Sequence, residues 1–190
     1  MKGIRLITVI GCLLASHSAL AATTTGTVNV TLVLTNACIV NGSNNTTGVP
    51  LGNLNFGTQP TTFTTLTTQL ANGASSSFTV HCPANDTPSA VLTNSVNTAP
   101  SGTVVGTPGT PQRFANSSVT NDGVYYSVYA TNPSPTPGTA LTNGATIPPA
   151  STPTPGTETY TLYGQIVGNG TNTGITAGTY TDVLNITITY

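Results

Sequence analysis

Few side chains in this sequence could do chemistry, and those that could are scattered. His81 stands beside Cys82, whereas a zinc site needs three or four converging ligands. A Ser/His/acid triad would have to use His81 with Asp86, and a spacing of five residues gives no reason to expect the two side chains to meet. No nucleophile-elbow sequence is present. The carboxylates beyond residue 21 are Asp86, Asp122, Glu158 and Asp182. We expect them to solvate loops or cap turns rather than to face each other as a glycosidase pair does. The sequence therefore predicts no enzyme, no metal site, no cofactor and no small-molecule substrate.

The first 21 residues are typical of an export signal. Lys2 and Arg5 form a basic start, residues 6–15 are apolar but too short to span a bilayer, and residues 19–21 form a small-x-small cleavage site. We expect the mature chain to begin at Ala22. The alternative is a lipoprotein box ending in Cys12, which would leave this cleavage site unused.

The cysteine content agrees with export. Removal of the signal would discard Cys12 and leave Cys38 and Cys82. An even pair in an oxidising compartment predicts one disulfide. Two free, buried thiols are the alternative.

The composition predicts an all-β protein with a surface made of hydroxyl and amide groups. Charged residues make up 4% of the chain, against about 25% in a typical domain. Thr is abundant and Lys and Glu are rare, which favours pleated strands over helices. The whole sequence has three Lys and Arg residues, too few to neutralise a run of phosphates. This excludes ordinary nucleic-acid binding and polybasic docking to a membrane.

Short strands separated by turn clusters recur along the mature chain. The clearest spans residues 27–35, where aliphatic and polar residues alternate, although Val33 interrupts the polar side. Further expected strands are residues 38–40, 51–56, 63–70, 76–82, 90–93, 124–130, 159–167 and 180–190. Gly, Pro, Asn or Ser lies between them, a spacing typical of a sandwich or barrel.

Two stretches lack a strand pattern. Residues 94–111 are rich in Thr, Gly and Pro, and residues 131–156 contain seven prolines among Thr, Ser and Gly. We expect both to be extended surface loops. The two strands expected after residue 156 could not bury a core alone, so the pattern favours one domain.

Several short motifs follow one another along the chain. They are residues 26–32 (GTVNVTL), the cysteines within 36–38 (NAC) and 78–82 (FTVHC), 54–57 (LNFG), Arg113 before 125–129 (YYSVY), 160–164 (YTLYG) and 178–182 (GTYTD). In this order they resemble the spore coat protein U domain family and the archaic, Csu-type chaperone-usher pilins. The resemblance covers nearly all of the mature chain. The Pro-rich insert at 131–156 departs from the family pattern, which leaves the role of that loop open.

The resemblance implies an incomplete immunoglobulin-like β-sandwich that lacks its last strand and has one disulfide. In such pilins a hydrophobic groove stays open beside the C-terminal strand. A periplasmic chaperone fills the groove first. At the outer-membrane usher, the N-terminal donor strand of the next subunit replaces the chaperone, and repetition builds a fibre by adding a strand to an exposed edge.

Two aliphatic stripes fit these roles. The expected donor stripe consists of Val28, Val30, Leu32 and Leu34. The expected acceptor stripe, which should face the core and line the groove, consists of Leu184, Ile186, Ile188 and Tyr190 on the closing strand. The alternative for the first stripe is an ordinary strand that folds into its own sandwich.

The sequence thus predicts a signal peptide at 1–21, a donor-strand extension at 22–36 and a pilin domain at 37–190. We expect a fibre-building pilus subunit that is exported through the periplasm to the cell surface and supports adhesion and biofilm formation. Its partners would be neighbouring subunits, a chaperone and an usher. The alternative is a secreted spore-coat-like module, or a tip or minor adhesive module, that does not build the shaft.

Overall fold

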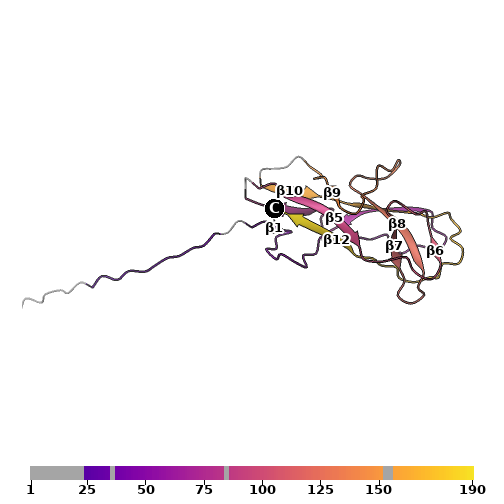
Figure 1. Cartoon of the computed structure of the whole chain (residues 1–190), viewed down its shortest axis with the longest axis horizontal. Helices are drawn as coiled ribbons and strands as arrows, with labels where there is room; N and C mark the ends of the chain where they lie inside the picture. The colour runs from indigo at the N-terminus through magenta and orange to yellow at the C-terminus, as the bar shows by residue number, and fades with distance from the viewer. Residues whose placement is uncertain (1–23, 35–36, 84–85, 152–155) are drawn as a thin grey trace, which may run out of the picture. The chain divides into compact units, whose positions relative to one another are not determined.

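The computed structural model describes residues 24–34, 37–83, 86–151 and 156–190, so the expected signal peptide lies outside the described residues. The chain divides into two units, Met1–Leu34 and Thr35–Tyr190. The described part of the larger unit contains strands and no helix, as Figure 1 shows. The predicted all-β class is therefore confirmed.

Twelve strands make up the described part of the larger unit, and most are short. They are β1 (Ile39–Val40), β2 (Asn53–Leu54), β3 (Thr65–Ala71), β4 (Phe78–His81), β5 (Ser89–Ser95), β6 (Val104–Val105), β7 (Arg113–Asn116), β8 (Gly123–Tyr129), β9 (Ala145–Ile147), β10 (Thr157–Tyr160), β11 (Tyr163–Val167) and β12 (Leu184–Thr189).

The strands form three sheets in a sandwich-like arrangement. One sheet has the order β1-β4-β10, a second has the order β2-β3-β11-β8-β6 with β7 also pairing β8, and the third has the order β12-β5-β9. All pairings are antiparallel except that of β6 with β8, which is parallel. Antiparallel sheets of this kind bury one face and leave the other in water.

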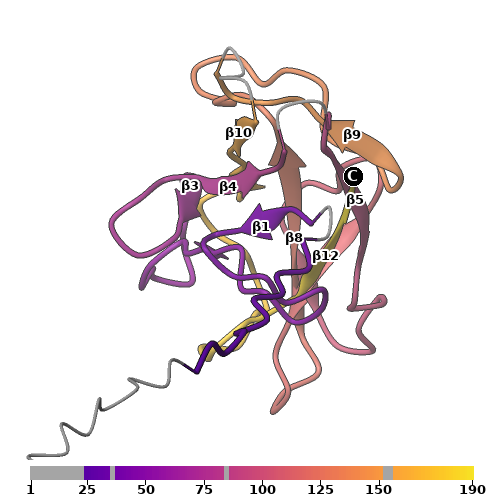
Figure 2. The ribbon, with the colours of Figure 1, turned by 90° about the vertical axis from the view of Figure 1, so that its left-hand side faces the viewer.

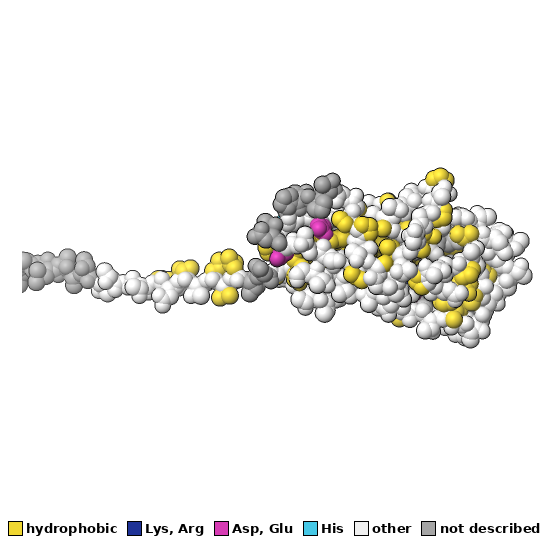
Figure 3. Space-filling model, turned by 45° about the horizontal axis from the view of Figure 1, so that its top comes forward, with side chains coloured by type: hydrophobic (Ala, Val, Ile, Leu, Met, Phe, Trp, Pro, Cys, Tyr) yellow, Lys and Arg dark blue, Asp and Glu magenta, His cyan; other side chains and the backbone are white. Residues whose placement is uncertain are grey.

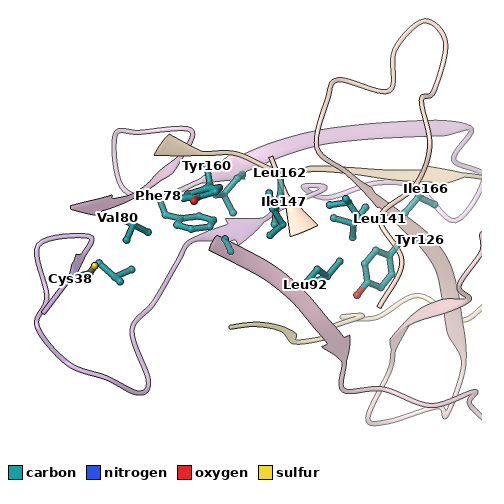
Figure 4. Packing of buried hydrophobic residues seen from close by; sticks show 14 of the residues in the cluster. Cys38, Phe78, Val80, Leu92, Tyr126, Leu141, Ile147, Tyr160, Leu162 and Ile166 are labelled. Carbon is teal, nitrogen blue, oxygen red and sulfur yellow. The ribbon is translucent and has the colours of Figure 1, made fainter. Parts of the chain in front are cut away.

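One hydrophobic core draws on all three sheets (Figure 4). Phe78 of β4 stacks on Tyr160 of β10 with the ring centroids 5.2 Å apart. Leu92 of β5 and Ile147 of β9 are completely buried, and Ile166 of β11 closes the cluster from the six-stranded sheet. The alternation of buried and exposed residues in β3 and β4 is what a strand with one face on a core requires.

The structure corrects four expectations. The strand expected at 159–167 is two strands, because the chain crosses between sheets at Thr161 and Leu162: β10 pairs β4, whereas β11 pairs β3 and β8. The loop expected at 94–111 contains β6, and the loop expected at 131–156 contains β9, whose Ile147 is buried. The closing strand begins at Leu184 rather than at residue 180.

Candidate functional site

The C-terminal strand β12 lies at the edge of its sheet. It pairs with β5 from Leu184 opposite Ser95 to Thr189 opposite Ser89, and no other strand of the described residues pairs with its second side. A strand in this position presents unpaired N–H and C=O groups to any strand that can reach them. Among the described strands, β1 pairs only with β4 and is also an edge. In Figure 1 it lies at the same end of the unit as the C-terminal end of β12, and Figure 2 looks onto that end.

Side chains of β12 alternate between the core and the solvent. Leu184, Ile186 and Ile188 are half-buried and pack against the core cluster, while the residues between them are exposed. Half-burial at an edge means that part of each aliphatic surface has no partner within the described chain. Tyr190 differs from the expectation, since it follows the last residue of β12 and is 51% exposed.

The N-terminal segment 24–34 is a unit with no strand pairing of its own. Its aliphatic residues Val28, Val30, Leu32, Val33 and Leu34 are between 77% and 91% exposed. The strand expected at 27–35 is therefore not formed in the single chain, and residue 35 lies outside the described part. A lone extended segment has no ladder partner for its backbone groups, so a period-two pattern alone does not make it a strand.

Asp182 fixes the point where the chain enters β12. Its carboxylate accepts hydrogen bonds from the Tyr126 hydroxyl at 2.6 Å, from the Asn97 backbone N–H at 2.9 Å and from the Val183 N–H at 2.8 Å. The Asn97 side chain in turn donates to the Phe114 carbonyl at 2.9 Å. Burial, with the carboxylate as acceptor, raises the pKa of Tyr126, so the phenol keeps its proton. These contacts tie the start of the edge strand to β7 and β8.

Arg113 is buried to 1% exposure at the start of β7. Its guanidinium donates to the Leu141 carbonyl at 3.0 Å and to the Asn143 side-chain oxygen at 2.8 Å. Burial lowers the pKa of Arg113, and the nearby Tyr126 and Asp182 oppose that effect. From the sequence, Arg113 was identified only as part of a family motif. A structural role could have been suspected because Arg113 is the only Lys or Arg beyond residue 5.

The predicted disulfide is confirmed. Cys38 bonds to Cys82, which lies 44 positions further along the sequence, and their Cα atoms are 4.2 Å apart. The bond joins the ends of two paired strands, since Ile39 of β1 lies opposite His81 of β4. It therefore secures the edge strand β1, which has only two residues in its ladder.

Two further features of the described residues are the His81 ring and a surface hollow. The His81 ring is exposed and shares a hydrogen bond with the Thr157 hydroxyl at 2.6 Å. Within the described residues no three His, Cys, Asp or Glu side chains gather as metal ligands. A hollow of about 350 Å³ is lined by backbone and small side chains around Pro148, Pro149 and Tyr163. This lining holds no carboxylate, imidazole or thiol.

The surface carries few charges. Figure 3 shows one face on which uncharged polar side chains predominate and apolar spots are scattered. Across the described ranges, no helix has the length and apolar character to cross a membrane.

The described residues form an all-β, sandwich-like arrangement with one disulfide and a C-terminal strand that is paired on one side only. The chain belongs to the Spore Coat Protein U domain family, whose profile matches residues 24–187. This is a pilin-type family associated with surface fimbriae, which implies an extracellular location. No curated protein has a sequence that matches the chain.

Proposed function

We propose that the chain is a structural subunit of an archaic chaperone-usher pilus that polymerises by donor-strand complementation and supports surface adhesion and biofilm formation. Residues 1–21 would direct export, residues 22–36 would be the donor extension and residues 37–190 the pilin domain. The partners would be neighbouring subunits, a periplasmic chaperone and an outer-membrane usher. The chain would pass through the periplasm to the cell surface.

The observation that carries this proposal is a pair of unmatched apolar stripes. One is the exposed set Val28, Val30, Leu32 and Leu34. The other is the half-buried set on β12, beside an edge without a partner among the described strands. Covering four aliphatic side chains contributes about 1.5–3 kcal/mol each, or roughly 6–12 kcal/mol before ordering costs. Because the donor stripe and the acceptor edge belong to different surfaces, such contacts are head-to-tail, and repetition gives a filament where the rotation between subunits does not close a ring.

The test places a charge on either face of the donor segment. Val30→Asp or Leu32→Asp should abolish fibres, because a carboxylate would have to enter an apolar groove without a partner. Thr31→Asp is the matched control: it adds the same charge one residue away, on the alternate face, and should still give fibres. Electron microscopy of cells that produce each variant measures the outcome. Chaperone capture, measured by copurification, should survive all three changes because the domain itself is unaltered.

Normal fibres from Val30→Asp and Leu32→Asp would overturn the donor role. A soluble monomer from the unaltered chain would favour the alternative, a secreted spore-coat-like or tip or minor adhesive module. N-terminal sequencing of the exported chain tests the expected start at Ala22.

A further inference from the structure

Two exposed valines lie opposite each other just past the paired ends of β5 and β12. The register of this pair continues past its end, so Val183 lies opposite Val96, and the Val96 N–H donates to the Val183 carbonyl at 2.9 Å. Directly opposed residues point to the same side of a sheet. Val96 is 56% exposed and Val183 is 59% exposed. The outward residues farther along β12 are polar, namely Asn185, Thr187 and Thr189.

The N-terminal segment has one matching irregularity. The even-numbered residues from 28 to 34 are aliphatic, and every odd-numbered residue from 25 to 35 is Thr or Asn except Val33. Val33 is 77% exposed. If the segment becomes a strand, its side chains alternate, so Val33 must point away from the core-facing stripe.

We propose that Val33 of a second copy docks beside Val96 and Val183, and that this contact sets the register of the donor strand. The inference rests on the proposed function. The donor would run antiparallel to β12 with Val33 opposite Val183. On the core side this register places Leu32, Val30 and Val28 opposite Leu184, Ile186 and Ile188 respectively.

The same register also matches the outer face. Thr31 would lie opposite Asn185, and Asn29 opposite Thr187. Apolar residues therefore meet apolar residues on both faces, and polar residues meet polar residues. Only Gly26, which has no side chain, falls opposite the Tyr190 ring.

Backbone geometry supports a close Val33–Val183 contact. Val183 directs its carbonyl toward β5, so its neighbour Leu184 directs its backbone groups to the free edge. In an antiparallel ladder the edge-facing residues form the hydrogen-bonded pairs. The residues between them form non-hydrogen-bonded pairs, whose side chains are closer. Val33 and Val183 would be a pair of the second kind.

The competing registers fit worse. A shift by two residues pairs Leu34 with Leu184, but it places Val33 opposite Asn185 and leaves Val183 facing Thr35. A parallel donor with Val28 beside Leu184 places Val33 opposite Thr189. Each alternative mixes apolar and polar residues on the outer face.

The proposed occupant is a second molecule because the chain's own segment is too short. Six residues of β12 separate Val183 from Thr189, about 20 Å at 3.3 Å per residue. The strand β1, which begins at Ile39, lies at the same end of the unit as the C-terminal end of β12 (Figure 1). Six steps from Val33 to Ile39 span at most about 20 Å when fully extended. Nothing would remain for the reversal of direction that an antiparallel strand of the same chain requires.

Cysteine pairs on the full chain, in a native host that lacks its own copy of the gene, test the register. Val33→Cys with Val183→Cys should give a covalent ladder of subunits on a non-reducing gel. Val33→Cys with Asn185→Cys should not, because diagonal neighbours lie about 7–8 Å apart and a disulfide needs Cα atoms closer than about 7 Å. Each single cysteine variant controls for exchange with the native disulfide and should give no ladder.

The outcomes separate the register from the function. A ladder only from the Val33→Cys, Asn185→Cys pair, or fibres in which neither cysteine pair forms a cross-link, would overturn the register. The proposed function as a fibre subunit would still stand in both cases. A cross-link within one chain, or no fibres from the unaltered protein, overturns both. As a second measurement, Val33→Thr and Val183→Thr fibres should dissociate at lower denaturant concentration than the unaltered fibres. Val119→Thr, at an exposed loop valine, should leave that midpoint unchanged.

Discussion

Arg113 shows how one buried side chain can hold a long insert. Its guanidinium bonds the Leu141 carbonyl and the Asn143 side chain, both in the segment that leads into β9. A hydrogen bond from a charged donor contributes about 1.5–3 kcal/mol. Arginine side chains are mostly exposed in proteins, whereas the Arg113 side chain lies in the interior.

Replacing Arg113 by Met should therefore destabilise the fold by about 3 kcal/mol, because the buried Leu141 carbonyl and the Asn143 oxygen both lose a charged donor. The free energy of unfolding in denaturant measures the effect. Asn143→Ala is the control, since it removes one acceptor and leaves the guanidinium bonded to Leu141; its loss should be smaller. Equal stability of Arg113→Met and the unaltered chain would contradict the role.

Asp122 makes stability depend on acid pH. Hydrogen bonds from Thr176, and from the backbone N–H of Thr103 at 2.9 Å, lower the pKa of its carboxyl below the ordinary value. The unfolded chain then binds a proton more readily than the folded chain. The contribution of Asp122 to stability is complete above the ordinary Asp pKa and is lost as the pH falls through the lower, folded value.

We expect Asp122→Asn to reduce stability at neutral pH and to flatten the loss of stability below about pH 4, the ordinary Asp pKa. Unfolding midpoints measured from pH 7 to pH 2 provide the test. An unchanged slope in Asp122→Asn would show that the acid sensitivity arises elsewhere.

At the scale of elements, the sequence pattern identified strands where alternation was long and missed them where it was short. The strands expected near residues 65–71, 78–81 and 124–129 are present. The sequence pattern does not show that the chain crosses between sheets at Thr161. The alternation of residue types continues from β10 into β11, although β10 pairs with β4 and β11 pairs with β3. The three residues of β9 lie among prolines, and only tertiary packing of Ile147 reveals them.

The disulfide is an element-scale constraint on β1 and β4. In the chain-entropy view, closing a loop of 44 residues stabilises the fold by about 4 kcal/mol. The double variant Cys38→Ser, Cys82→Ser should lose roughly that amount in denaturant unfolding. Each single variant tests whether a free thiol adds a further penalty. A difference below about 1 kcal/mol, under the low end of typical losses, would show that the short β1 ladder needs no covalent support.

At the scale of the whole molecule, the local sequence pattern predicts some residues of the candidate site but not the contacts that join distant parts of the chain. Period-two alternation predicted the aliphatic residues of both stripes. It could not show that Asp182 anchors the start of β12 through Tyr126 and Asn97, because these residues are far apart in the sequence. The Val96–Val183 spot depends in the same way on a strand register that only the fold supplies.

If the proposed function is right, a subunit that lacks the donor segment can occupy only one position in a fibre. The compact unit begins at Thr35, so deleting residues 22–35 removes the exposed aliphatic segment and leaves every described strand in place. Such a subunit could accept a donor strand and could not supply one. In a head-to-tail assembly it can therefore occupy only the terminal position whose donor would be unused.

The deletion variant, carrying an epitope tag and coexpressed with the unaltered chain, should be found at one end of each fibre. Gold-labelled antibody and electron microscopy locate the tag. The reverse variant, Ile186→Asp, keeps its donor segment and places a charge in the groove that the chaperone must fill first, so it should fail to copurify with the chaperone and should be absent from fibres. Label from the deletion variant along the shaft would mean that subunits join without residues 22–35, and donor-strand assembly would then be wrong for this chain.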